Sequence, residues 1–142
     1  MRIIVEYLEP GKPLRDAGIE DMLVFLGSAR IKARDDVEAA LKALSADASA
    51  NDLKRANSTV EMSKYYVASR ELTARLTVWA QEFVSNGLGS GRHFSVITGG
   101  GPGILDAVNR GAEEVGGTTI SMNISLLFEQ YPNEYIADGL VS

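Results

Sequence analysis

Short continuous apolar runs alternate with longer helical repeats along the chain. Residues 22–26 form one such run, which ends at Gly27, and its length and flanks predict a strand buried on both faces. Two further runs, residues 94–98 and residues 118–124, predict a second and a third strand.

Apolar positions at steps of three or four residues predict helices between these strands. A short helix is expected to begin after Asp35 and Asp36, since acids suit the first turn of a helix. Its inner face is expected to hold Val37, Leu41 and Leu44. A helix over residues 104–115 follows the second strand, and its inward positions are Ile104, Leu105, Val108 and Ala112.

The longest helix is expected over residues 60–84, after a small, polar loop at residues 45–57. Its inward stripe comprises Met62, Tyr66, Ser69, Leu72, Leu76, Trp79 and Phe83. Aromatic residues at helical spacing more often form core or subunit contacts than a stacking platform for a base. We therefore assign these roles to Tyr65, Tyr66 and Trp79.

The predicted order is β-α-α-β-α-β, which indicates an α/β fold with a parallel sheet, right-handed crossovers and flanking helices. Residues 1–20 contain two prolines and two glycines and are interpreted as an N-terminal arm, and residues 21–142 as one domain. In such sheets, ligands bind beyond the carboxyl ends of the strands. Both glycine-containing loops, after residue 26 and after residue 98, are expected at those ends.

Four glycines stand within five positions between the second strand and the following helix. Glycine lets a backbone approach a ligand closely, and the N–H groups of a helix N-terminus favour an anion. The alternative is a tight turn that binds nothing. We favour a site for a nucleotide or another phosphate-bearing molecule, with these candidate binding residues: Gly27, Ser28, Gly99, Gly100, Gly101 and Gly103.

Two familiar nucleotide motifs are not met by this loop. A dinucleotide fingerprint needs G-x-G-x-x-G, but the third position here is Ile104. A P-loop needs G-x-x-x-x-G-K-[S/T], and no such string occurs. A redox cofactor such as NAD is therefore disfavoured.

Several polar residues have a structural and a functional interpretation. Ser28 is a turn serine or a ligand contact, and Arg70 is expected to pair with an acid one turn away. Asp106 would repel a phosphate at its helix end, so a capping role is expected. Glu129 is interpreted as a salt-bridge partner, and His93, the sole histidine, has no neighbouring ligand set for a metal.

Charge and composition narrow the class of partner. The 142 residues carry 14 basic and 19 acidic side chains, a formal charge of −5, which argues against general nucleic-acid binding. No cysteine is present, so disulfides and thiolate metal sites are excluded, and a cytoplasmic protein is expected. No apolar run approaches the roughly 20 residues of a membrane span.

Two blocks of the sequence, FLGSAR at residues 25–30 and TGGGPGILDA at residues 98–107, resemble the Lonely Guy family of nucleoside 5′-monophosphate phosphoribohydrolases. NRGA at residues 109–112 and FEQYPN at residues 128–133 extend the resemblance. It implies a Rossmann-like, three-layer α/β/α fold, homo-oligomers and no cofactor. The implied reaction hydrolyses the N-glycosidic bond of AMP or a cytokinin nucleotide to free base and ribose 5-phosphate.

The chain departs from the family at one important point. The resemblance places the catalytic glutamate and the phosphate-holding glycines in a second signature, P-G-G-x-G-T-x-x-E, with an arginine shortly before it. No P-G-G string occurs in this sequence, so its catalytic residues are unknown. We expect an N-terminal portion of an enzyme that is inactive alone. The alternative is a non-catalytic carrier of a nucleotide or of the molybdenum cofactor.

Overall fold

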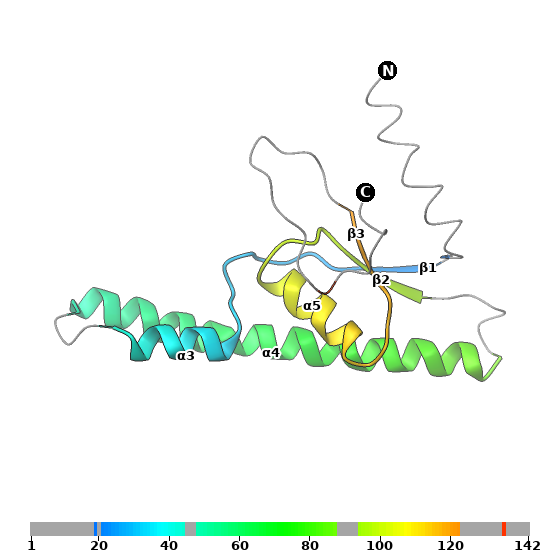
Figure 1. Ribbon diagram of the computed structural model, residues 1–142, viewed down its shortest axis with the longest axis horizontal. Coiled ribbons are helices and arrows are strands. Elements are labelled where there is room, and N and C mark those ends of the chain that lie inside the picture. The colour runs from blue at the N-terminus through cyan, green and yellow to red at the C-terminus, as the bar shows by residue number, and fades with distance from the viewer. Residues whose placement is uncertain (1–18, 20, 45–47, 88–93, 123–134, 136–142) are drawn as a thin grey trace, which may run out of the picture.

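The computed structural model describes residue 19, residues 21–44, 48–87 and 94–122, and residue 135. Their element order is β1, α3, α4, β2, α5, β3, which confirms the alternation predicted from the sequence (Figure 1). The described residues do not include His93 or Glu129. Of the predicted N-terminal arm they include only Ile19.

The three strands form one parallel sheet in the order β1-β2-β3. β1 spans Asp21–Val24, β2 spans Phe94–Thr98 and β3 spans Thr119–Ser121. Leu23 pairs with Val96, and Val96 pairs with Thr119, so these three residues share one face of the sheet. The predicted α/β fold with a parallel sheet and flanking helices is confirmed at this level.

The continuous apolar run at residues 22–26 predicted a strand buried on both faces, and this prediction is wrong for β1. Burial alternates along the strand, and the side chain of Val24 is 63% exposed. Phe25, just after β1, packs against a core of Val96, Val108 and Ala112. The crossovers of a sheet ordered 1-2-3 lie on one face, and α4 and α5 lie on the same side of the strands (Figure 1). The described helices therefore cover only the face to which Leu23 and Phe25 belong.

The helix α3 spans Arg34–Lys42 and buries Val37, as predicted. The next helix, α4, spans Ala50–Ser85 and begins ten residues before the predicted start. Ser49 and Asp52 form a capping box, in which the Ser49 hydroxyl accepts from the Asp52 N–H and the Asp52 carboxylate accepts from the Ser49 N–H. The prediction of a loop at residues 45–57 is therefore wrong from residue 50 onward.

The buried face of α4 is also different from the predicted stripe. Tyr66 is buried as predicted, but the other buried residues are small or hydroxyl-bearing: Ser63, Thr73, Thr77 and Ala80. Leu72 and Trp79 were expected to face inward and are about half exposed. The periodicity correctly predicted a helix, but most of the buried residues of α4 are small or hydroxyl-bearing. Trp79 and Phe83 nevertheless pack against Phe94 of β2, with ring centroids 5.6 Å and 6.0 Å from the Phe94 ring.

The contact between α4 and α5 explains this choice of small residues. α5 spans Ile104–Glu113, and Val108 and Ala112 turn toward the sheet. A Cβ added to Gly111 would lie 2.2 Å from the carbonyl oxygen of Arg70, so the two helix backbones approach too closely for any side chain there. The Gly111 position fixes the distance between α4 and α5.

Candidate functional site

The two glycine-containing loops meet at the carboxyl ends of β1 and β2. The N–H of Phe25 donates to the carbonyl oxygen of Ile97 at 2.9 Å and continues the β1–β2 ladder. The N–H of Ile104, the first residue of α5, then donates to the carbonyl oxygen of Ser28 at 3.1 Å. The structure thus brings the two groups of predicted site residues together.

Gly27 and Gly103 are required by the contact between these loops. A Cβ on Gly27 would lie 2.4 Å from Cγ2 of Ile104, and a Cβ on Gly103 would lie 2.4 Å from the carbonyl oxygen of Ser28. Gly103 also has a φ of +81°, which side chains rarely adopt. Packing alone therefore accounts for both glycines. Ser28 accepts from the N–H of Arg30 through its hydroxyl at 3.2 Å, the geometry of a turn serine.

The remaining candidate glycines form the segment between β2 and α5. Gly100 has a φ of +67°, and its N–H donates to the Thr98 hydroxyl at 3.0 Å. Gly101 is buried. A Cβ on Gly99 would meet Leu105 at 3.6 Å, an ordinary van der Waals distance. Steric packing therefore does not require a glycine at position 99.

A cavity of about 610 Å³ opens beside the paired loops. Its wall is formed by the loop after β1, the first turns of α3 and α5, and the middle of α4. Two cationic side chains, Lys32 and Arg110, line it together with three carboxylates, Asp35, Asp36 and Asp106. Tyr66 and Tyr135 supply aromatic surface. The cavity shares Gly103 with the glycine loop, and it therefore extends the predicted site toward the helices.

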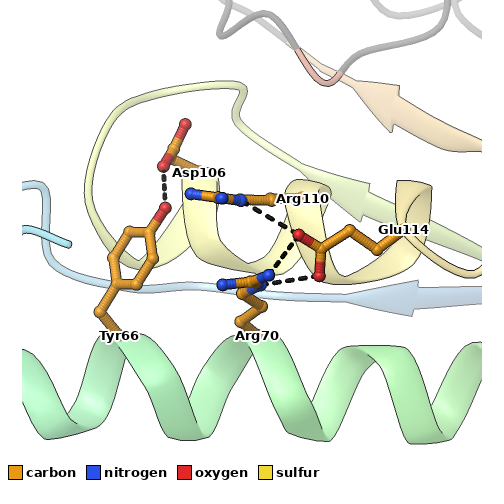
Figure 2. Close-up of polar contacts among 5 residues, drawn as sticks. All are labelled: Tyr66, Arg70, Asp106, Arg110 and Glu114. Carbon is orange, nitrogen blue, oxygen red and sulfur yellow. Dashed lines mark hydrogen bonds and ion pairs between the residues drawn. The ribbon is translucent and has the colours of Figure 1, made fainter. Parts of the chain in front are cut away.

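Tyr66 and Asp106 join α4 to α5 at this wall. The Tyr66 hydroxyl donates to the Asp106 carboxylate (Figure 2). Burial and this hydrogen bond raise the pKa of Tyr66 above its usual value. The expectation that Asp106 caps its helix is wrong. The N-cap is Gly103, which makes no side-chain cap bond, and the Asp106 carboxylate accepts a hydrogen bond from Tyr66 on another helix.

A second polar contact lies beside the first. Arg70 of α4 donates to both carboxylate oxygens of Glu114, just after α5, at 2.7 Å and 2.5 Å. Arg110 donates to the same carboxylate at 3.1 Å (Figure 2). These hydrogen bonds, from Arg70 first, lower the pKa of Glu114 below its usual value. The expected partner of Arg70, an acid one turn away on its own helix, is therefore wrong.

Sequence reasoning did not connect these five residues. Asp106, Arg110 and Glu114 are four residues apart in turn, as are Tyr66 and Arg70, so each set lies on one face of its helix. Hydrogen bonding with Tyr66, and then with Glu114, raises the pKa of Arg110 above its usual value. Arginine is already a cation at neutral pH with its ordinary pKa, and Arg110 places that cation at the cavity wall. The four-residue spacing of polar residues on both helices is the feature of the sequence that could have predicted these contacts.

No three carboxylate or histidine side chains in the described ranges converge as metal ligands would. None of the helices in that part of the chain combines the length and apolar character of a membrane crossing. Comparison of the chain with protein-family models and with curated proteins finds no match.

Proposed function

We propose that this chain binds a purine nucleoside 5′-monophosphate at the carboxyl ends of its strands, in the cavity beside the two glycine loops. We also propose kinship with the Lonely Guy family, on the sequence blocks at residues 25–30 and 98–112. The finer fold that this kinship implies, a Rossmann-like domain with helices on both faces of the sheet, is part of the same proposal. A small cytoplasmic metabolite as ligand fits a cysteine-free chain.

One observation carries the proposal. The cavity lies directly against Ala29, Pro102 and Gly103, where the loops after β1 and β2 meet. Ligands of parallel α/β sheets bind at this end of the strands. A volume of about 610 Å³ is also in the range of small-molecule pockets.

The charged lining suggests how the ligand is oriented. Arg110 and Lys32 are the cations available in the lining to a phosphate, and arginine suits phosphate because its planar fork donates two hydrogen bonds. Asp35 and Asp36 are acceptors, which suits the exocyclic amino group of adenine. Acids outnumber cations in the lining, so a phosphate is tolerated only close to Arg110 and Lys32. AMP should therefore bind more tightly than inosine 5′-monophosphate, which has a carbonyl oxygen in place of the amino group.

The reaction that the resemblance implies is hydrolysis of the bond between base and ribose. The residues that the resemblance assigns to catalysis have no counterpart in these 142 residues. The proposal for this chain is therefore binding of the nucleotide, and bond cleavage is proposed for a protein that also carries the second signature. A carrier without hydrolytic activity would share the binding step.

Calorimetric titration of the 142-residue chain with AMP, inosine 5′-monophosphate and adenosine tests the proposal. We expect AMP to bind best of the three compounds. Arg110→Gln should weaken the affinity for AMP at least about tenfold, because one charge-assisted hydrogen bond is lost. Arg55→Gln is the matched control, since Arg55 is an exposed arginine of α4 outside the cavity lining. Glu114→Gln controls for loss of the Arg110 ion pair.

A folded chain that binds none of the three compounds would overturn the proposal. Equal binding of adenosine and AMP would overturn the role of Arg110 and Lys32 as phosphate ligands. Chromatography of the same mixtures measures free adenine, and release above a buffer blank would place catalytic residues within this chain.

A further inference from the structure

Arg110, the arginine that the proposed function assigns to the phosphate, shares a carboxylate with a second arginine. Its Nε donates to Glu114 at 3.1 Å, and Arg70 donates to the same carboxylate at 2.7 Å and 2.5 Å (Figure 2). Arg110 lines the cavity, whereas Arg70 and Glu114 are not among the lining residues. Two cations and one anion therefore form a cluster behind the cavity wall, and Arg110 is the member that reaches the cavity.

The contact with Glu114 leaves the outer end of the Arg110 guanidinium available to a ligand. The N–H donors of a guanidinium lie in one rigid plane, so an acceptor at Nε also fixes the direction of the terminal donors. Figure 2 shows the terminal nitrogens of Arg110 pointing away from Glu114, toward Tyr66 and Asp106 of the cavity wall. Glu114 therefore orients the part of Arg110 that would meet a phosphate.

An aromatic ring also lies near this guanidinium. Cζ of Arg110 is 5.8 Å from the centroid of the Tyr135 ring, and a cation within about 6 Å of a ring centroid is attracted to the ring. The carbonyl oxygen of Tyr135 accepts from the Thr119 hydroxyl of β3 at 2.6 Å. The orientation of Arg110 is thus set by contacts within the protein before a ligand binds.

A carboxylate beside a phosphate-binding arginine also has a disadvantage. With Arg110 as its sole partner, Glu114 would cancel the charge of the arginine and repel an incoming phosphate. Arg70 removes this disadvantage, because it pairs with the carboxylate and leaves the three side chains with one net positive charge. The hydrogen bonds from Arg70, and then from Arg110, lower the pKa of Glu114, so its charged form is favoured in the cluster.

We propose that Arg70 is a positioning residue for the phosphate: it neutralises Glu114, so that Glu114 orients Arg110 without cancelling its charge. The inference rests on the proposed nucleotide site and deepens it. It assigns to a side chain outside the cavity an effect on ligands that carry a phosphate, and no effect on ligands that lack one.

Calorimetric titration with AMP and adenosine tests this role. Arg70→Gln removes the neutralising charge, so the affinity for AMP should fall about three- to fivefold, whereas the affinity for adenosine, which has no phosphate, should not change. Arg70→Lys keeps the positive charge and should retain most of the affinity for AMP. Arg75→Gln is the matched control, since Arg75 is an exposed arginine of α4 outside the cavity lining.

A second substitution separates positioning from a purely structural role. Adding Glu114→Gln to Arg70→Gln removes the carboxylate that Arg70 no longer neutralises, so the affinity for AMP should return to within about twofold of the wild-type value. A purely structural role predicts no recovery, because the double variant has lost the same ion pair between α4 and the end of α5. Circular dichroism checks that every variant keeps its helices.

The outcomes distinguish this inference from the proposed function. If the wild-type chain binds AMP and Arg70→Gln binds it equally well, the role of Arg70 is overturned and the nucleotide site stands. An equal loss of AMP and adenosine binding, a loss in Arg70→Lys as large as in Arg70→Gln, or no recovery in the double variant would also overturn the role of Arg70. A folded wild-type chain that does not bind AMP would overturn the proposed function, and the positioning role with it.

Discussion

The N–H of Ile104 donates to the carbonyl oxygen of Ser28 at 3.1 Å, and this hydrogen bond joins the loop after β1 to the start of α5. The bond forms because the neighbouring positions, Gly27 and Gly103, have no side chains to hold the loops apart. The glycines of the predicted site therefore divide into two kinds. Gly27 and Gly103 permit packing, whereas packing does not require a glycine at position 99.

Gly103→Ala is expected to destabilise the protein whether or not a nucleotide is present. A residue with a side chain pays about 1–2 kcal/mol for positive φ, and the new Cβ would also overlap the carbonyl oxygen of Ser28. We expect a loss of at least about 2 kcal/mol in the free energy of unfolding, by urea denaturation. Wild-type stability in this variant would show that the loops do not meet as described.

Gly99→Ala separates binding from packing. The added Cβ would lie 3.6 Å from Leu105 and 4.0 Å from the carbonyl oxygen of Met122, so the fold should accept it within about 0.5 kcal/mol. If the backbone at Gly99 approaches the ligand, AMP binding should weaken while the melting temperature of the free protein stays the same. Unchanged AMP affinity would remove Gly99 from the site.

Gly111→Ala should destabilise the protein although alanine is the better helix former. Helix propensity alone favours alanine by about 1 kcal/mol inside a helix such as α5. The Cβ would lie 2.2 Å from the carbonyl oxygen of Arg70, so α4 and α5 must move apart, at a cost of about 1–3 kcal/mol. Urea denaturation gives the net sign, and a more stable variant would contradict the close helix contact.

The contact between Arg70 and Glu114 predicts a dependence of stability on pH. Its hydrogen bonds hold the pKa of Glu114 in the folded protein below its usual value of 4.5. The contribution of this contact to the free energy of unfolding is therefore complete above pH 4.5. It is lost as the pH falls through the lowered pKa of Glu114. Both side chains are more than a third exposed, so solvent screening limits the effect to less than about 1 kcal/mol.

Glu114→Gln should lower the free energy of unfolding at neutral pH, and the difference from the wild-type chain should disappear in acid. Thermal unfolding at a series of pH values, repeated in high salt, measures this difference. A difference that persists unchanged below the lowered pKa would assign the effect to packing and not to charge.

Local patterns in the sequence predicted most elements of the described fold. The run at residues 94–98 and the glycines that follow it place β2 and the start of α5 correctly. The start of α4 was missed because the cap at Ser49 depends on Asp52, three residues ahead, and the small polar residues between looked like a loop.

The sequence by itself determined the alternation of strands and helices, the parallel sheet and the glycine loops at its carboxyl ends, because these follow from spacing along one segment. Tertiary structure decided which face of α4 is buried and which partner Arg70 takes. Gly111 allows α5 to approach the stripe of small residues on α4, and that approach brings Arg70 to Glu114 and Tyr66 to Asp106. Leu72 and Trp79 remain about half exposed, because the face of α4 that is buried is the one that a second helix backbone can approach closely.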